Sequence, residues 1–284
     1  SLGWLLRLSD EDSLLEIQNS YMETVLPLLL GVLTSGLDPA VASPILLIPI
    51  LGLLDAVQYI PAARNEVCRS LHEVLINVWN LGDGTMTISC IYGLGICMSY
   101  GQPSLELAGA TVKALVSVLG LDPDSTPVEL NLDDDAQEAL LRDTALASLL
   151  RTSVYQAQLL GPDMSTQMLR LALSGLPLQD DQTEGQELHA LLMHLLETHD
   201  KRLVGENWSL LPDVFRAVAA MQIRVGNSYK KLKNAEGRSG KDLCELDEFW
   251  ESQNVLFDTF QKGCMAVKVL AAGNCPPSVK DELA

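Results

Sequence analysis

Two amphipathic stripes between Gly161 and Gly226 constrain the fold more than any other feature of this sequence. Their apolar residues recur with the spacing of one face of an α-helix. The first stripe consists of Leu188, Leu191, Leu192, Leu195 and Leu196, and the second of Leu211, Val214, Phe215, Val218 and Met221. The first stripe follows a D-x-x-E helix start at Asp181 and Glu184. The stretch therefore predicts helix, acidic turn, helix, loop and helix, an order typical of stacked helices.

The same helical period recurs along the rest of the chain, and few stretches show the two-residue alternation of β-strands. Leucine and alanine supply the apolar content while aromatic residues make up only 5%, which also favours helices. Further helices are predicted over 13–33, 40–60, 65–81, 86–100, 105–119, 140–160, 164–173 and 243–270. The predicted fold class is all-α.

Two of these helices carry unusual residues. In helix 13–33 Pro27 predicts a kink, and the inward face is predicted to hold Leu14, Ile17, Tyr21, Val25, Leu28 and Leu29. In helix 86–100, Gly93 and Gly95 each cost about 1 kcal/mol relative to alanine. A dinucleotide-binding fingerprint would need a third glycine where Met98 stands and a preceding strand. Close approach of a second helix is therefore the better explanation of the glycines.

The most apolar segment, Ala40 to Ile60, raises the alternative of a membrane span. A span needs roughly 20 apolar residues. Here Asp55 ends a run of 15 uncharged residues that contains Pro44 and Pro49. We therefore expect no membrane insertion and a helix buried between neighbouring helices.

Charge and cysteine usage limit the partners and the compartment. The net charge of −18 would repel a phosphate backbone, so direct nucleic-acid binding is not expected, whereas basic protein partners are permitted. Acidity that merely keeps the protein soluble is an equal alternative. The six cysteines form no C-x-x-C pair and sit mostly in apolar helical segments, which predicts reduced, buried thiols.

No residue pattern predicts catalysis, a metal site or a cofactor. His189, His194 and His199 are five residues apart, so no two share a helical edge as a zinc-binding H-E-x-x-H requires. Phosphate-binding and nucleophile-elbow motifs are missing from the sequence. We therefore expect that the protein is not an enzyme.

The predicted helices group into pairs over roughly 13–60, 65–100, 105–160, 164–197 and 209–270. Their spacing is compatible with the ~40–47-residue period of HEAT and armadillo arrays. Residues 1–284 are therefore predicted to form one α-solenoid segment of stacked antiparallel HEAT-repeat pairs, with an acidic loop at 120–135 and a basic loop at 226–242. The basic loop is either a solvated surface loop or a targeting patch.

Three segments resemble importin-β-type nuclear transport receptors, also called karyopherins-β. Tyr92-Gly93-Leu94-Gly95-Ile96 through Tyr100-Gly101 resembles their Y-G-L-G-V…Y-G helix. Leu176-Pro177-Leu178 through Glu184 resembles their L-P-L…D…E turn, and Leu203 to Asn207 with Leu211 to Phe215 resembles their L-G-x-N…L-P-x-[IV]-F segment. Order and spacing agree over about 88–220, and the branch that imports ribosomal proteins and core histones is the most similar.

The resemblance implies a carboxy-terminal receptor segment that carries basic protein cargo, such as ribosomal proteins and histones, between cytoplasm and nucleus through nuclear pores. It also implies binding of phenylalanine-glycine nucleoporin repeats, and a site for the GTPase Ran mainly in repeats that would precede Ser1. Because the chain lacks an initial methionine, we expect it to be a fragment. The alternative is a generic HEAT scaffold or adaptor subunit of a stable intracellular complex.

In such receptors the first helix of each pair is outermost and the second lines the concave face. On that architecture the candidate cargo-binding residues are Asp133, Asp134, Asp135, Glu138, Asp180, Asp181, Glu184, Glu187 and Glu197. Nucleoporin repeats are expected in leucine-lined grooves beside the outer helices 65–81, 105–119 and 164–173. The acids also favour the helix dipole where they stand and need no partner for that purpose, which leaves a purely structural role open.

Overall fold

A computed structural model describes residues 11–35, 39–121, 130, 132, 134–178, 182–198, 200–204 and 209–233, with the single positions 258, 261, 262 and 265. Every regular element in these ranges is helical, so the predicted all-α class is confirmed. The chain divides into two compact units, the first formed by Ser1–Met168 with Gln179–Asp181 and the second by Leu169–Leu178 with Gln182–Ala284. Each unit is described by itself.

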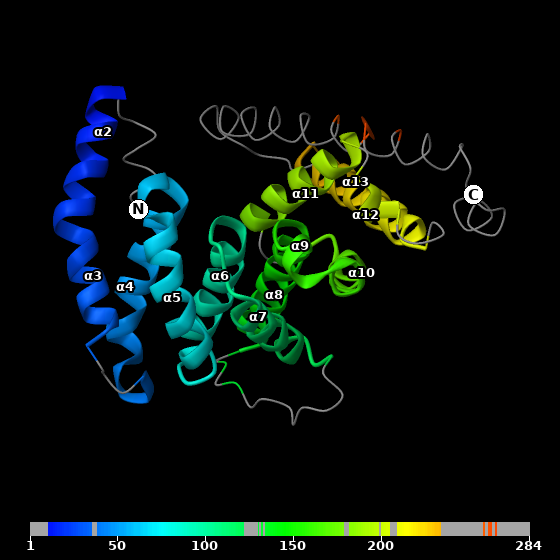
Figure 1. The fold of residues 1–284 in the computed structure, drawn as a ribbon. Coiled ribbons are helices and arrows are strands. Elements are labelled where there is room, and N and C mark those ends of the chain that lie inside the picture. The colour runs from blue at the N-terminus through cyan, green and yellow to red at the C-terminus, as the bar shows by residue number, and fades with distance from the viewer. Residues whose placement is uncertain are drawn as a thin grey trace. The chain divides into compact units, whose positions relative to one another are not determined.

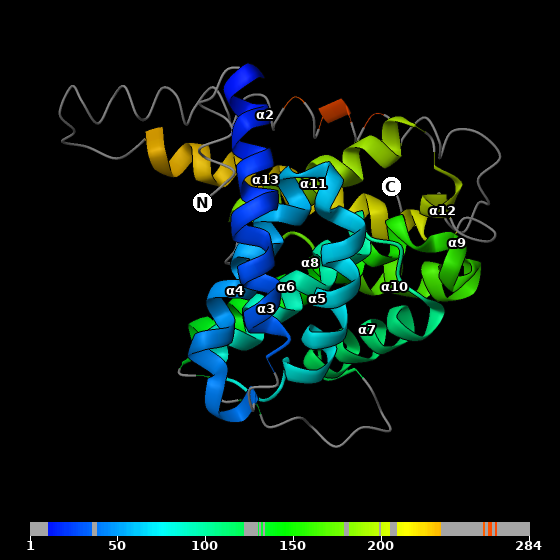
Figure 2. The same ribbon diagram turned by 60° about the vertical axis from the view of Figure 1, so that its left-hand side comes forward.

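The first unit is built from helices that pack in two rows (Figures 1 and 2). Helices α3, α5 and α7 contact one another in succession, and so do α4, α6 and α8. Helices that follow one another in the sequence also pack together, as α3 does with α4 and α5 with α6. The elements are α2 (Glu11–Ser20), η1 (Tyr21–Val25), α3 (Leu26–Leu33), α4 (Pro39–Tyr59), η2 (Pro61–Ala63), α5 (Arg64–Val78), α6 (Gly84–Tyr100), α7 (Leu105–Val118), α8 (Asp135–Tyr155), α9 (Ala157–Leu160) and the start of α10 (Pro162–Gly175).

Helix α6 contacts α4, α5, α7 and α8, and its glycines allow two of these neighbours to approach closely. A Cβ added at Gly93 would lie 2.8 Å from a methyl carbon of Leu75 in α5. A Cβ added at Gly95 would lie 2.9 Å from the Cα of Ser148 in α8. The predicted close approach over small residues is therefore confirmed.

The first long helix changes its register at a π-helical turn, Tyr21–Val25. A π-turn holds one residue more than an α-turn, and Pro27, which has no N–H to donate to an earlier carbonyl, follows it directly. Because of the extra residue, Leu26 is buried whereas Val25 and Leu28 are exposed. The expected disturbance near Pro27 is present, but the prediction that Val25 and Leu28 point inward is wrong.

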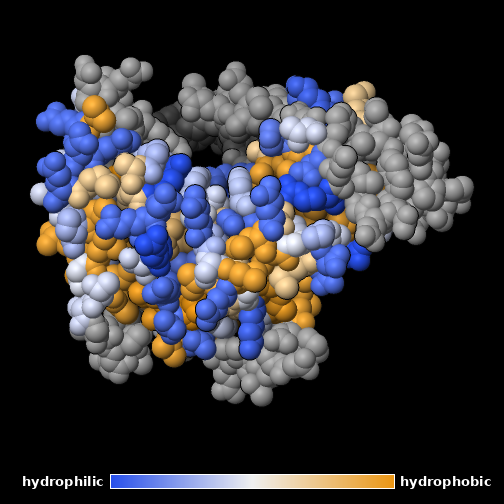
Figure 3. Space-filling view, in the orientation of Figure 1, coloured by the Kyte–Doolittle hydropathy of each residue, from blue (hydrophilic) through white to orange (hydrophobic). Residues whose placement is uncertain are grey.

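Helix α4 is exposed along one edge, which contradicts the expectation that it lies buried between neighbours. Ile45, Ile48 and Leu51 are 56%, 71% and 47% exposed, whereas Ile50 and Leu53 on the opposite side are fully buried. Figure 3 shows hydrophobic residues at the surface on the side where α3 and α4 lie in Figure 1. The helix packs on α3, α5 and α6, and this edge meets no other helix of the described ranges.

Within the described residues, no single helix is both long and apolar enough to cross a membrane. One bent pair, Ile45–Tyr59 with Pro61–Val78, meets the length and composition requirements only when the two helices are taken together. The angle between them is 113°.

The second unit contains the end of α10 and the helices α11 (Gln182–Glu197), α12 (Lys201–Val204) and α13 (Leu211–Lys233). Both stripes that opened the sequence analysis lie on these helices, and their leucines and valines are buried except for the half-buried Leu191. Arg170 of α10 donates to the Ser209 hydroxyl at 3.2 Å and lies 3.8 Å from a carboxylate oxygen of Asp213. Because the apolar stripes of α11 and α13 are buried, the two predicted amphipathic helices are confirmed.

Helix α13 continues to Lys233, so the prediction of a basic loop that begins at 226 is wrong over about its first half. Gly226 lies inside the helix because the lysines and leucine that follow it are good helix formers and offset the cost of one glycine. Residues 234–242 and nearly all of the predicted helix 243–270 lie outside the described residues.

Candidate functional site

The first candidate surface is the start of helix α8. The Asp134 carboxylate accepts a hydrogen bond from the backbone N–H of Gln137 at 2.9 Å and caps the helix. Helix α8 therefore begins at Asp135, before the predicted range 140–160, and Asp134 caps it because an extended backbone at Asp134 brings its side chain over the first turn. Asp134, Asp135 and Glu138 are all exposed, as the cargo prediction requires.

A fourth carboxylate joins this group from helix α6. Asp83 is exposed and caps α6 by accepting from the Met86 N–H at 2.9 Å. The start of α6 lies against the start of α8, since a Cβ added at Gly84 would lie 2.8 Å from the side-chain amide carbon of Gln137. We call Asp83, Asp134, Asp135 and Glu138 the acidic group. Sequence reasoning missed Asp83, although its place before a helix and after a glycine is a typical capping signal.

The predicted acidic residues of helix α11 differ from those of α8, because not all of them are exposed. Glu184 is only 5% exposed, so the prediction that it is a surface carboxylate is wrong. Glu184 lies one turn before the buried Leu188 on the same side of α11. Its side chain therefore points inward, as the apolar residues of the first stripe do. Glu187 is exposed. Asp133, Asp180, Asp181 and the side chain of Glu197 lie outside the described residues.

Glu187 also belongs to the second compact unit, whereas the acidic group belongs to the first. The continuous acidic strip that parallel stacking of the two predicted clusters would give therefore remains a prediction. The acidic group itself already combines carboxylates from two successive helix pairs, which is the arrangement that the strip was expected to have.

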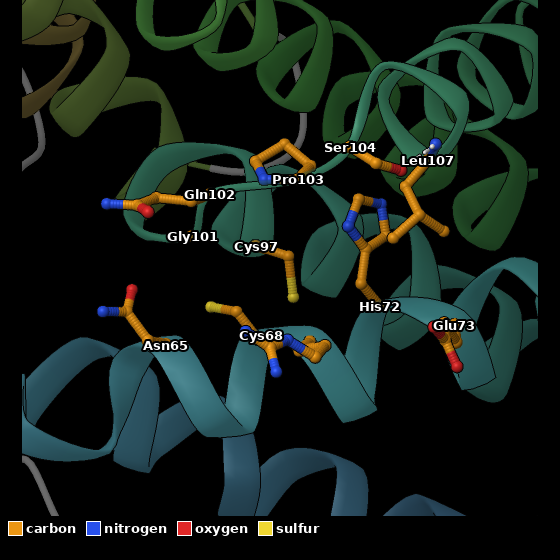
Figure 4. Close-up of a pocket in the computed structure, with 11 residues that line it drawn as sticks. Asn65, Cys68, His72, Glu73, Cys97, Gly101, Gln102, Pro103, Ser104 and Leu107 are labelled. Carbon is orange, nitrogen blue, oxygen red and sulfur yellow. Dashed lines mark hydrogen bonds between the residues drawn. The ribbon is translucent and has the colours of Figure 1, made fainter.

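A second candidate surface is a pocket of about 370 Å³ between α5 and α7, closed by the end of α6 and the loop that follows it (Figure 4). Its walls are Asn65, Cys68, Arg69, His72, Glu73, Cys97, Gly101, Gln102, Pro103, Ser104 and Leu107. Only one leucine is among them. The expectation of a leucine-lined groove between these two outer helices is therefore wrong. Cys68 and His72 of α5 line the pocket in place of leucines.

His72 crosses from α5 to α7 at one side of this pocket. Its Nε2 lies 2.6 Å from the Thr111 hydroxyl, a hydrogen bond between two buried side chains. Burial lowers the pKa of His72 to about 4, so the imidazole is neutral near pH 7. It holds the two helices together as an uncharged polar bridge.

Within the residues that the structure describes, no group of three or more histidine, cysteine or acidic side chains is arranged to hold a metal ion. The two candidate surfaces offer exposed carboxylates in one and a polar pocket in the other. Comparisons with protein-family models, with curated proteins and with solved structures find no match to this chain.

Proposed function

We propose that this chain is a HEAT-type α-solenoid segment of an importin-β-like nuclear transport receptor, which binds basic protein cargo as it moves between cytoplasm and nucleus. The acidic group, Asp83, Asp134, Asp135 and Glu138, is the proposed cargo surface. Lysine-rich segments such as those of ribosomal proteins and histones have the complementary charge. The proposal rests on the motif resemblance, the helix packing of the first unit and the placement of these four carboxylates.

The packing order supports the solenoid. Helices α3, α5 and α7 form one row and α4, α6 and α8 the other, with each pair buried against the next. HEAT arrays have this order because one helix pair cannot bury its own apolar face, whereas stacked pairs share a continuous core. The exposed edge of α4 is consistent with a repeat array, in which each pair offers apolar surface to a neighbour.

The single observation that carries the cargo proposal is the meeting of two helix starts. The second helices of successive pairs, α6 and α8, begin side by side at Gly84 and Gln137, so Asp83 and the three acids at the start of α8 lie at the same end of the two helices. Exposed ion pairs are worth only ~0.2–1 kcal/mol each. Several acids on one surface are therefore needed to bind a flexible basic tail, and the affinity should fall as salt is added.

The structural alternative is that these acids only stabilise their helices. Asp83 and Asp134 do cap helices, and acidic residues in a first turn interact favourably with the helix dipole. A cap needs one oxygen, which leaves the other free to meet a cation. Asp135 and Glu138 are the residues that separate the two roles, because neither provides the observed cap.

The test is a double charge reversal, Asp135→Lys with Glu138→Lys, that leaves both capping aspartates in place. Glu16→Lys with Glu23→Lys is the matched control, because both residues are exposed and the change in net charge is the same. Binding of a fluorescent lysine-rich histone-tail peptide is measured at low salt after circular dichroism has shown equal helicity. We expect roughly tenfold weaker binding for the first variant than for the control. Equal binding by both variants would exclude the acidic group as the cargo surface and would favour the scaffold alternative.

Nucleoporin repeats remain a proposed partner, but the α5–α7 groove supports them less than the sequence suggested. A phenyl ring gains about 2 kcal/mol on full apolar burial, and this pocket offers it mainly polar walls. Titration of a phenylalanine-glycine peptide, followed by NMR, tests whether docking occurs here or beside α10, the other predicted outer helix. The absence of any shift at millimolar peptide would remove nucleoporins from the proposal.

A further inference from the structure

Two cysteine side chains face each other at the base of the pocket between α5 and α7. Cys68 comes from α5 and Cys97 from the end of α6, and a hydrogen bond joins their thiols in the pocket drawn in Figure 4. Both thiols are reduced and both line the pocket. The pair therefore combines two features that a single buried thiol lacks. Each sulfur has a partner sulfur on the neighbouring helix, and a pocket gives small molecules access to the pair.

The surroundings favour a thiolate at Cys68. The Cys97 thiol hydrogen-bonds to the Cys68 sulfur and lowers the pKa of Cys68, against the effect of burial, and the positive charge of Arg64 lowers it further. The same hydrogen bond, together with burial, raises the pKa of Cys97. Cys68 is thus the more acidic thiol and the nucleophile of the pair.

Arg64 is fixed in this position by three contacts at the start of α5. Its guanidinium donates to the backbone carbonyls of Val57 at 2.8 Å and Gln58 at 2.9 Å. It also lies over the Tyr100 ring, 4.5 Å from the ring centre. The cation near Cys68 is therefore part of the fold and does not depend on a mobile side chain.

The pocket sets the size and polarity of a reagent that can reach Cys68. Its volume of about 370 Å³ and its polar lining, which includes Asn65, Arg69 and Gln102, suit a small hydrophilic molecule. Gly101 closes the wall behind Cys68, where an added Cβ would lie 2.9 Å from the Cys68 Cβ. Cys68 and Cys97 both line the pocket and are 4% and 1% exposed, so Cys68 is the more accessible of the two.

We propose that Cys68 and Cys97 form an oxidation site, at which a small hydrophilic disulfide converts the two thiols into a disulfide bond between α5 and α6. The Cys68 thiolate attacks one sulfur of the reagent R–S–S–R, forms Cys68–S–S–R and releases R–S⁻, which takes up a proton. The Cys97 thiol then loses its proton and attacks the Cys68 sulfur, and a second R–S⁻ leaves. Two protein thiols are oxidised, and one reagent disulfide is reduced to two R–SH.

Cys90 provides the internal comparison. It lies on the same helix as Cys97 and is fully buried, but it does not line the pocket. Burial raises the pKa of Cys90 to about 12. It should therefore stay reduced under conditions that oxidise the pair.

The experiment treats the folded chain of 284 residues with hydroxyethyl disulfide near neutral pH, blocks the remaining thiols with N-ethylmaleimide and identifies linked peptides by mass spectrometry. Digestion with trypsin and chymotrypsin separates Cys90 from Cys97, because Tyr92 lies between them. We expect a Cys68–Cys97 peptide pair that lacks two hydrogen atoms, with Cys90 alkylated. Recovery of Cys68 and Cys97 in alkylated form, under conditions that oxidise the urea-unfolded chain, would overturn the proposal.

Three variants resolve the steps. Cys97→Ser should accumulate the hydroxyethyl mixed disulfide on Cys68, since the second attack cannot occur. Cys68→Ser should leave Cys97 unmodified over the time in which Cys68 reacts in the Cys97→Ser chain, because Cys97 is the more buried and the less acidic thiol. Cys90→Ser is the control and should form the link as the parent does. A Cys97→Ser chain with native helicity and an unmodified Cys68 would contradict the proposed nucleophile. If a variant loses helicity, the parent digest alone decides.

Discussion

Gly95 of α6 lies against the backbone of Ser148 of α8, so closely that an added Cβ would stand 2.9 Å from the Ser148 Cα. The Ser148 hydroxyl donates to the Ile91 carbonyl at 2.9 Å, one turn earlier on α6. The two helices thus meet through a glycine and a buried hydrogen bond, with no large side chain between them. This contact explains physically why a G-x-G segment stands in the middle of a helix.

Gly95→Ala should destabilise the first unit by roughly 2–3 kcal/mol, because the new methyl group overlaps a backbone that cannot move independently of α8. Gly109→Ala is the matched control, since Gly109 lies in α7 with nothing within 4 Å of its added Cβ. That change should stabilise the protein by about 0.4–1 kcal/mol. Urea unfolding followed by circular dichroism measures both, and equal midpoints would show that α6 and α8 do not pack as described.

His72→Gln should remove an acid sensitivity of the fold. The pKa of His72 is about 4 in the folded protein and 6.5 when the imidazole is exposed to water, so between these values the unfolded chain binds a proton that the folded chain does not. Stability is therefore complete above pH 6.5 and falls as the pH falls toward 4. At pH 5 the loss relative to pH 7 should be about 2 kcal/mol larger in the parent than in His72→Gln.

His194→Gln is the control for that experiment, because His194 is exposed on α11. Unfolding midpoints in urea are measured at both pH values for the parent and the two variants. A parent and a His72→Gln variant that lose stability in parallel would show that the imidazole is not held neutral in the folded state.

Asp134→Ala should cost about 1 kcal/mol, since it removes the side chain that satisfies the Gln137 N–H at the start of α8. Asp135→Ala removes the same charge one residue later but no cap, and should cost roughly 0.3 kcal/mol through the helix dipole. Thermal unfolding compares the two variants. A larger loss for Asp135→Ala than for Asp134→Ala would contradict the role of Asp134 as the cap of α8.

Ile48→Ala should change stability by less than about 0.5 kcal/mol, because the Ile48 side chain is 71% exposed. Ile50→Ala, the same chemical change two residues later on α4, should cost roughly 2–5 kcal/mol, because Ile50 is fully buried. Denaturation midpoints of both variants give the comparison. A large loss for Ile48→Ala would mean that the apolar edge of α4 is covered by another part of the chain.

The sequence by itself determined where the helices are. Apolar spacing near 3.6 residues is a local property, and it placed α5, α6, α7 and α11 with small errors at their ends. It also identified the reason for Gly93 and Gly95, because two glycines within a helix are unfavourable unless something needs the space. Helix ends were less well predicted, as the end of α13 at Lys233 shows, since caps and fraying depend on single residues.

The tertiary structure decided which sides of the helices are used and which distant residues meet. A π-turn before Pro27 turned Val25 outward, and the helix spacing that buries Leu188 also buried Glu184. Asp83 joined the acidic group only because α6 packs against α8, and Cys68 met Cys97 only because α5 packs against α6. A periodic pattern fixes the direction of a side chain relative to its own helix. Its surroundings depend on how the helices pack against each other, and that packing is set by side chains summed over the whole core.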